Sequence, residues 1–488
     1  MEPAPVAPGS ADTPSDPVGG APEPTGGAEA GHPHRATAWP EARAVAHRAG
    51  IAARAGREPT GLPLGRALGQ VLMGPLPALA DLPSFDTSAM DGWAVAGPGP
   101  WHVREEPTVL AGHAPAAALA DGEAVRIATG APVPPGTTAV LRTEHSRTEH
   151  PDGGRRAPLH ALREVVTGQD IRPRGQECRS GDELLPAGTT VTPAVLGLAA
   201  AAGYDELLVL PRPRVEVLVL GDELLTAGLP HEGLIRDALG PMLGPWLAAL
   251  GADVLATRRI GDDAEALHAA VTGSAADLVL TTGGTAAGPV DHVHRVLDKA
   301  GATLLVDGVK VRPGHPMLLA RLGADPARPH RVRHLVGLPG NPLAAVSGLL
   351  TLAAPLLAAL SGDGPRAQGG PRAEDGPYAE DGPRTEDGPR AEGGAGSGAR
   401  PPVPYRVPVR DEVHGHPHDT RLVPVVRRSG SAVPLRYHGP AMLRGIAAAD
   451  GLAVVPPGGA RPGQELDVLD LPWPPTAGAA PAQGACFT

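Results

Sequence analysis

The sequence predicts a multidomain α/β plus β protein, in which a central three-layer α/β domain has a parallel-rich sheet. Residues 212–362 alternate strand-like and helix-like segments, a pattern typical of a parallel sheet covered by helices. Residues 87–170 and 402–471 hold short strand-like runs, which predict a small inserted β-domain and a C-terminal β-domain. The length of 488 residues requires more than one domain.

The stretch DLVLTTGGTAAGPVD, residues 277–291, is the feature around which the central domain is organised. Its apolar run LVL predicts a buried parallel strand. Gly283, Gly284 and Gly288 let the backbone turn sharply and approach a ligand closely. The free N–H groups of the next helix suit an oxyanion, and Asp291 falls in that helix's first turn. Taken alone, the stretch is better explained as a tight turn with a capping acid.

Further strand–loop–helix units repeat this pattern. Strands are expected over 215–221, 252–257 and 332–338, and helices over 237–250, 264–271 and 342–360. The loops after these strands contain Asp222-Glu223, Gly261-Asp262-Asp263 and the sequence PGNP at 339–342. In PGNP, Asn341 fits an N-cap and Pro342 fits the first helical position. Because carboxyl ends of parallel strands meet at one edge, these loops are expected to line one ligand crevice.

Composition excludes several classes of protein. The formal charge of −11 argues against broad binding to nucleic acid or an anionic membrane. Cys178 and Cys486 are the only cysteines, so neither a disulfide framework nor a zinc cluster can be built from them. This cysteine usage fits a reducing cytoplasm. Aromatic residues make up 2% of the chain, so the cores must consist mainly of Leu, Val and Ala.

Two segments bear on membrane targeting. The N-terminus is acidic and Pro-rich without an apolar run, so no signal peptide is expected there. Residues 343–360 carry no charge over a length near the lower limit for a membrane span. They follow PGNP as a sheet-covering helix should, contain Pro355 and lack flanking basic anchors, so a buried helix is predicted.

Composition shifts along the chain predict its division into domains. Helices are expected over 39–54 and 64–73, and between about 191 and 203. A hexad such as PRAEDG repeats after residue 365 and cannot bury a core, which predicts a flexible linker. The predicted segments are a disordered tail (1–35), a mixed α/β linker domain (36–86 with 171–211), the inserted β-domain (87–170), the central domain (212–362), the disordered linker (363–401), the C-terminal β-domain (402–471) and a disordered tail (472–488).

Two loop-like stretches outside the central domain carry polar residues. PSFDTSAMDGWAV at 83–95 is dense in turn formers and contains Asp86 and Asp91. RIATGAPVPPGTTAVLRTE at 126–144 is rich in Gly, Pro and Thr between strand-like ends. By itself the first stretch is explained equally by a plain hinge between domains.

Taken in order, these motifs resemble the MoeA-type molybdopterin molybdenumtransferases, which are related to the E domain of gephyrin. The resemblance covers most of residues 39–471. It rests on PSFDTSAMDGWAV, RIATGAPVPPGTTAV, DIRPRG with GDELLPAG, GDELL, GDD, TTGGTAAGPVD, RPGHP, LPGNPLAAV and AMLRGIAAADGLAVVP. One glycine motif alone is a weak signal, whereas the ordered set is specific for the family.

The resemblance implies a molybdopterin-binding-type central domain and a homodimer with its site in a cleft shared between subunits. The implied reaction inserts molybdate into adenylylated molybdopterin and releases AMP with the help of Mg²⁺. Implied partners are a molybdopterin adenylyltransferase and the enzymes that accept the cofactor. Carried over residue by residue, the catalytic residues are Asp91, Glu223, Asp262 and Asp291, the last three also as metal ligands. The implied substrate-binding residues are Thr129, Arg172, Glu177, Gly283, Gly284, Gly288, Arg312, His315, Pro339, Gly340, Asn341 and Pro342.

The sequence departs from the family pattern at several polar positions. His315 stands where a lysine is usual, and Glu177 where an aspartate is usual. Leu220 replaces a threonine, Leu239 an asparagine, Ala286 a serine and Pro440 a serine. These losses leave an alternative open: a catalytically reduced paralogue that acts as a molybdopterin or cofactor carrier, or as a scaffold. Retention of the four acids favours the enzyme, and the additional domains argue against a molybdopterin adenylyltransferase.

Overall fold

The structure, a computed structural model, describes residues 36–105, 107–114, 117–148, 158–285, 292–323, 330–362 and 405–473. Several features predicted from the sequence lie outside these residues. They are the N-terminal tail, Ala286, Gly288, Asp291, the hexad-repeat linker and all but the first two residues of the C-terminal tail.

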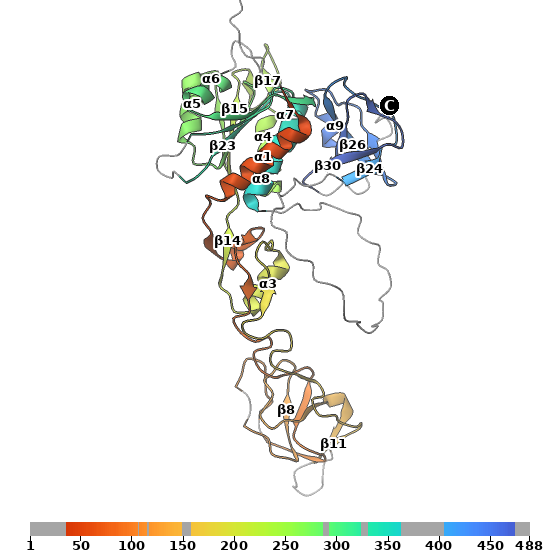
Figure 1. The fold of residues 1–488 in the computed structure, drawn as a ribbon. Coiled ribbons are helices and arrows are strands. Elements are labelled where there is room, and N and C mark those ends of the chain that lie inside the picture. The colour runs from red at the N-terminus through yellow and green to blue at the C-terminus, as the bar shows by residue number, and fades with distance from the viewer. Residues whose placement is uncertain are drawn as a thin grey trace, which may run out of the picture. The chain divides into compact units, whose positions relative to one another are not determined.

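The central sheet has six strands in the order β18-β15-β19-β23-β22-β20. Figure 1 labels two of these strands, β15 and β23, between α5 and α1. Its four parallel strands are β15 (Arg214–Leu220), β18 (Asp253–Ile260), β19 (Leu278–Thr282) and β23 (His334–Leu338). The antiparallel strands β22 (Leu318–Arg321) and β20 (Thr303–Asp307) complete one side. The predicted parallel-rich sheet is confirmed. Strands β20 and β22 were not predicted, because apolar runs this short cannot be told from a buried helix by periodicity.

Side chains of the central strands alternate between two helix-covered faces. On β19, Leu278 and Leu280 belong to one buried cluster and Val279 to another. The first face is covered by α1 (Trp39–Arg54), α4 (Leu239–Ala249), α7 (Pro342–Gly348) and α8 (Ala354–Ser361). The second is covered by α5 (Ala264–Gly273) and α6 (Val293–Lys299). Strands between two helical layers make the predicted three-layer domain.

The most apolar helical segment is buried in this core. A π-helical turn, η2 (Leu349–Ala353), joins α7 to α8. The segment from Pro342 to Ser361 is long and apolar enough to cross a membrane, but 89% of its most apolar window lies inside the molecule. It packs against α1, where Trp39 Nε1 donates to Thr351 Oγ1 at 3.0 Å and Arg43 donates to the Leu350 carbonyl. The contacts agree with the predicted buried helix.

A second sheet joins three separate parts of the chain. Its strands follow the order β1-β21-β26-β28-β30-β24, with β27 beside β26. They are β1 (Thr37–Ala38), β21 (Val309–Arg312), β26 (Thr420–Arg428), β27 (Ser431–Pro434), β28 (Gly451–Val455), β30 (Glu465–Asp470) and β24 (Tyr405–Pro408). β21 pairs in parallel with β26, so Val311 lies opposite Thr420. A segment predicted within the central domain therefore belongs to the sheet of the C-terminal region.

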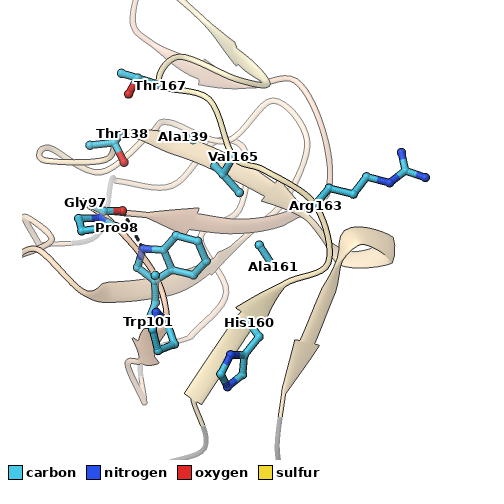
Figure 2. Close-up of a pocket in the computed structure, with 12 residues that line it drawn as sticks. Gly97, Pro98, Trp101, Thr138, Ala139, His160, Ala161, Arg163, Val165 and Thr167 are labelled. Carbon is cyan, nitrogen blue, oxygen red and sulfur yellow. Dashed lines mark hydrogen bonds between the residues drawn. The ribbon is translucent and has the colours of Figure 1, made fainter.

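The inserted region forms a β-domain with its own cores. Its sheet has the order β10-β11-β7-β8-β6-β9. The strands are β6 (Gly92–Val95), β7 (Trp101–Val103), β8 (Glu123–Ile127), β9 (Ala139–Arg142), β10 (Ser146–Thr148) and β11 (Pro158–Ala161). A cavity of about 660 Å³ lies here beside Trp101, whose Nε1 donates to the Gly97 carbonyl at 3.0 Å (Figure 2). In the same view His160 lies below the indole ring and the Arg163 guanidinium points away from it.

The segments that lead into and out of the β-domain form small paired elements. They are β2 (Thr60–Pro63), α2 (Leu64–Ala67), β3 (Val71–Leu72), β4 (Leu76–Pro77), β5 (Thr87–Ser88), β12 (Ile171–Arg172), β13 (Glu183–Leu185), α3 (Pro193–Ala201) and β14 (Glu206–Leu210). The helix predicted over 64–73 is wrong beyond Ala67. Leu68 leaves the helical conformation with a ψ of 128°, Gly69 follows with a φ of 75°, and β3 then pairs with β14.

Candidate active site

The predicted ligand loops begin side by side at the carboxyl edge of the central sheet. In the register of the sheet, Leu220 lies opposite Ile260, and Thr282 lies opposite Leu338. The residues that follow these strand ends are Gly221–Glu223, Gly261–Asp263, Gly283-Gly284 and Pro339–Pro342. The four loops therefore lie at one side of the sheet, as expected, because parallel pairing brings the carboxyl ends of their strands together.

The glycine loop and the PGNP loop approach each other closely. Gly283 and Gly284 have φ values of 82° and 64°, a conformation that favours glycine. The Gly283 N–H donates to the Leu338 carbonyl at 2.8 Å, and a Cβ on Gly340 would lie 3.6 Å from Gly283 Cα. Leu220, where the family has a threonine, packs near Gly284, since a Cβ there would lie 3.3 Å from Leu220 Cδ1. This part of the site is therefore formed by backbone atoms of the two loops and by the apolar side chain of Leu220.

The start of α7 differs in one respect from the expectation. Asn341 is the N-cap residue and Pro342 opens the helix, as predicted, but the Asn341 side chain makes no capping hydrogen bond. Instead, the Pro440 carbonyl accepts from the N–H groups of Leu343 and Ala344, at 2.9 and 3.2 Å. The backbone of Pro440 therefore caps the helix, which leaves the Asn341 amide available at the surface.

The acidic loops contain one acid that caps a helix and three acids whose carboxylates have no hydrogen-bond partner among the described residues. Asp263 is the N-cap of α5, and its Oδ1 accepts from the Glu265 and Ala266 N–H groups at 2.8 and 3.2 Å. Asp222, Glu223 and Asp262 are exposed, and their carboxylates make no hydrogen bond to the described residues. Asp222, which the sequence analysis did not select, lies against the next loop, since its Oδ1 is 2.6 Å from where a Cβ on Gly261 would be. The capping of Asp263 leaves Asp262 as the free acid of its loop.

These carboxylates suit a hard cation by their chemistry. Mg²⁺ prefers oxygen ligands and keeps several waters, so a site of two or three exposed carboxylates matches it. Within the described ranges no group of three His, Cys, Asp or Glu side chains is already gathered around a metal position. Asp291, the third predicted ligand, lies outside those ranges.

A cavity of about 570 Å³ adjoins the PGNP loop. It is lined by the predicted residues Arg312, His315 and Asn341, together with Arg421 and His438 from the C-terminal region. Arg312 Nε donates to Asp419 Oδ2 at 2.9 Å, and half of the Arg312 side chain stays exposed. His315 Nδ1 lies 2.9 Å from the Val309 carbonyl, a hydrogen bond that requires the proton on Nδ1. The Nε2 atom of a neutral His315 is therefore an acceptor, which weakens its contribution to holding an anion.

A second group of predicted residues lies where the β-domain joins its flanking segments. Asp91 Oδ1 accepts from the Thr129 N–H at 2.7 Å and from Thr129 Oγ1 at 3.0 Å. These two bonds, the backbone one first, lower the pKa of Asp91 below its ordinary value. Arg172 stands on β12 opposite Thr87, and both Arg172 and Glu177 are exposed. In the part of the chain that the structure describes, no hydrogen bond or ion pair connects this group with the carboxyl edge.

Family models match three consecutive parts of the chain. Residues 38–203 match the MoeA N-terminal region (domain I and II), and residues 216–359 match a probable molybdopterin binding domain. Residues 406–471 match the MoeA C-terminal region (domain IV). Molybdopterin molybdenumtransferase 2 of Mycobacterium tuberculosis is 39% identical over 305 residues, which cover 59% of this chain and 72% of that protein. The chain belongs to the molybdopterin molybdenumtransferase family.

Further comparisons agree with membership of this family. The molybdopterin molybdenumtransferase of a Nostoc species is 31% identical over 307 residues, covering 61% of this chain and 68% of the relative. Two crystal structures of a molybdopterin biosynthesis MoeA protein from Pyrococcus horikoshii match at TM-scores of 0.64 and 0.59, with 21% and 20% identity. They cover 90% and 89% of this chain and 99% and 100% of those chains. The resemblance predicted from the motifs is confirmed, as is the multidomain fold.

The structure also adds residues of this molybdenumtransferase that the motifs did not indicate. Arg421 Nη2 lies 2.9 Å from His438 Nδ1, and its Nη1 donates to the His414 carbonyl at 2.6 Å. Burial lowers the pKa of Arg421, and burial followed by the Arg421 charge lowers that of His438. Tyr437 adopts a φ of 68° and lies under the Arg444 guanidinium, 4.5 Å from its ring centroid. Pro440 was the only nearby signal in the sequence, since Arg421 sits in an ordinary strand pattern.

Proposed function

We propose that this chain is the transferase that inserts molybdate into adenylylated molybdopterin and releases AMP in molybdenum cofactor biosynthesis. The observation that carries the proposal is the cavity beside the PGNP loop, with Arg312 and Arg421 on its walls. The carboxyl edge of the sheet also carries glycine loops and acids whose carboxylates have no hydrogen-bond partner among the described residues. A phosphate-bearing anion and a divalent cation together require this combination of groups.

Each part of the edge has a distinct role in the proposal. The guanidinium groups of Arg312 and Arg421 bind the anionic parts of the substrate, and each is already oriented by a hydrogen bond, to Asp419 and to the His414 carbonyl. Gly283, Gly284 and Gly340 let the substrate approach the backbone closely. The Asn341 amide is free to donate to the substrate and accept from it, since it does not cap α7.

Glu223 and Asp262 are proposed to hold Mg²⁺, with Asp291 as a further ligand and Asp222 beside them. When bound, the cation neutralises charge that develops on the phosphoryl oxygens as the adenylyl group is removed. The carboxylates of Asp222, Glu223 and Asp262 have no hydrogen-bond partner among the described residues, so no such partner has to be displaced when the cation binds.

The group at the β-domain junction completes the site in this proposal. The two hydrogen bonds from Thr129 orient the Asp91 carboxylate and lower its pKa further below neutral pH. A second copy of the chain would bring Asp91, Thr129, Arg172 and Glu177 to the carboxyl edge, as the family resemblance implies for a homodimer. The proposed partners are the adenylyltransferase that supplies the substrate and the enzymes that accept the cofactor. The proposed location is the cytoplasm, where a chain with two cysteines stays reduced.

The test is an assay with purified protein, adenylylated molybdopterin, molybdate and Mg²⁺, in which AMP release is measured by chromatography. We expect molybdate-dependent release by the wild type and a fall of at least about tenfold in Arg312→Gln, equivalent to about 1.4 kcal/mol of transition-state stabilisation. Arg406→Gln is the matched control, because Arg406 is exposed on β24 and pairs with Asp467 outside the cavity.

Other outcomes would replace the proposal. Tight binding of molybdopterin without AMP release would indicate the carrier or scaffold alternative. Absence of both binding and release would show that the family fold serves another ligand in this protein. Thermal unfolding of each variant separates a loss of activity from a loss of folding.

A further inference from the structure

A second charged cavity, of about 620 Å³, lies at the amino edge of the central sheet. Its walls include Arg214 at the start of β15, Asp277 just before β19 and Arg331 a few residues before β23. Arg57 and Arg212 come from the segments by which the chain leaves and re-enters the central domain. Five-residue strands span about 16 Å, so the cavity is separated from the ligand loops by the length of the sheet.

One buried acid organises the arginines of this cavity. Asp277 is 4% exposed, and its Oδ1 accepts from Arg331 Nε and Nη2 at 2.9 and 2.6 Å. Its Oδ2 accepts from the Arg214 N–H at 2.8 Å and lies 3.9 Å from Arg57 Nη2. Arg57 donates in addition to the carbonyls of Leu360, Pro211 and Arg212. The guanidinium groups of Arg331 and Arg57 are therefore held in place by hydrogen bonds to protein atoms.

Positive charge exceeds negative charge around the cavity. Four arginines line it, and the carboxylates on its walls are those of Asp277 and the exposed Glu58. Burial lowers the pKa of Arg57; Asp277 opposes this, and repulsion from Arg331, Arg214 and Arg54 adds to the lowering. The Arg57 guanidinium therefore has other positive groups around it in addition to its contact with Asp277.

Two of the arginines also keep unused hydrogen-bond donors. Arg212 donates to the Leu68 carbonyl at 3.3 Å, while its Nε is buried without a partner. Arg331 uses Nε and Nη2 on Asp277, and its Nη1 has no hydrogen bond to the described residues. Arg212 Nε is buried, so its missing partner costs free energy, whereas Arg331 Nη1 is not buried and can donate to a ligand in the cavity.

We propose that this cavity binds a compact tetrahedral oxyanion at a site separate from the substrate cavity. Guanidinium forks match the oxygen spacing of such anions. Among the described residues that line the cavity there is no Phe, Tyr or Trp, and the lining is dominated by arginines, which favours a compact anion over a ligand with a large apolar part. Phosphate, sulfate and molybdate share this geometry and charge. The anion would tie the two crossing segments, through Arg57 and Arg212, to the strand starts of the central domain.

The experiment measures thermal unfolding of the full chain with added phosphate, sulfate or molybdate, at constant ionic strength set with chloride. We expect a saturable rise in Tm of at least about 2 °C, since a ligand that binds only the folded state raises Tm with its concentration. The rise should vanish in Arg212→Gln and persist in Arg312→Gln, which alters the other cavity. Arg66→Gln is the control for loss of an arginine from the nearby α2 surface.

Each other result has a definite meaning. A rise that is lost in Arg312→Gln but kept in Arg212→Gln places the anion in the substrate cavity and overturns the proposal. Absence of a saturable rise with all three anions overturns it as well. A response to molybdate alone identifies a store of the substrate anion, whereas an equal response to phosphate identifies a general oxyanion site. If Arg212→Gln does not fold, Arg212→Lys retains the charge, and weaker binding, with a higher half-saturation concentration, is then expected.

Discussion

The two edges of the central sheet hold their charges in opposite ways. At the carboxyl edge, Asp222, Glu223 and Asp262 are exposed, and their carboxylates make no hydrogen bond to the described residues. At the amino edge, Asp277 is buried and accepts hydrogen bonds from Arg331 and from the backbone of Arg214. The acid at the amino edge therefore stabilises the fold, while the acids at the carboxyl edge remain available for ligands.

The largest expected effect comes from Asp277→Asn. This change leaves Arg331 and Arg57 buried without a counter-charge, and breaking one partner of a buried pair costs about 3–5 kcal/mol. We expect urea unfolding to show a loss of that size. Asp253→Asn, at the exposed start of β18 on the same edge, is the matched control and should change the free energy of unfolding by less than about 0.5 kcal/mol. Equal effects of the two changes would mean that Asp277 is not the stabilising acid of this edge.

His334, at the start of β23, adds a pH dependence to the amino edge. The backbone N–H of His334 donates to the Asp277 carbonyl at 3.0 Å. Burial lowers the pKa of the His334 imidazole from 6.5 to about 4. As the pH falls below 6.5 the unfolded chain takes up the proton first, so the free energy of unfolding decreases until about pH 4. The difference corresponds to on the order of 3 kcal/mol.

The measurement for His334 is the free energy of unfolding between pH 7 and pH 4, compared between the wild type and His334→Leu. The variant should lose less stability over this interval, because it has no imidazole to protonate. His231→Leu, an exposed histidine on a loop, should keep the wild-type slope. A slope unchanged by His334→Leu would show that carboxylates alone set the acid sensitivity.

The smallest effect on stability, and a clear one on activity, is expected at the carboxyl edge. Asp263→Ala removes the N-cap of α5 and should cost about 1 kcal/mol. Asp262→Asn removes no hydrogen bond, so it should leave stability within about 0.5 kcal/mol of the wild type. If Asp262 holds the cation, this variant should release AMP at least about tenfold more slowly. If Asp263→Ala slowed AMP release and Asp262→Asn lowered the stability instead, the metal would be assigned to Asp263.

Local patterns predicted much of the central domain because they depend on neighbouring residues. The helix over Trp39–Arg54 has the predicted bounds, and the loops at Gly283 and Pro339 follow strands as expected. The helix predicted over 64–73 is wrong because paired strands compete for the residues after Gly69. Arg421 was missed because it stands in an ordinary strand and reaches the cavity only through the placement of β26 beside β21.

From the sequence alone we predicted the family, the order of the four parallel strands of the central domain and the helices between them, and which loops carry glycines and acids. These properties follow from residue order, side-chain periodicity and turn-forming residues, all of which act over short stretches of chain. Only the tertiary structure decided that Asp263 caps α5, that the Pro440 carbonyl caps α7, and that Arg421 joins Arg312 at one cavity. It also gathered the arginines around Asp277 at the opposite edge. The physical reason is that hydrogen bonds and strand pairings between distant segments depend on packing geometry, which local patterns do not encode.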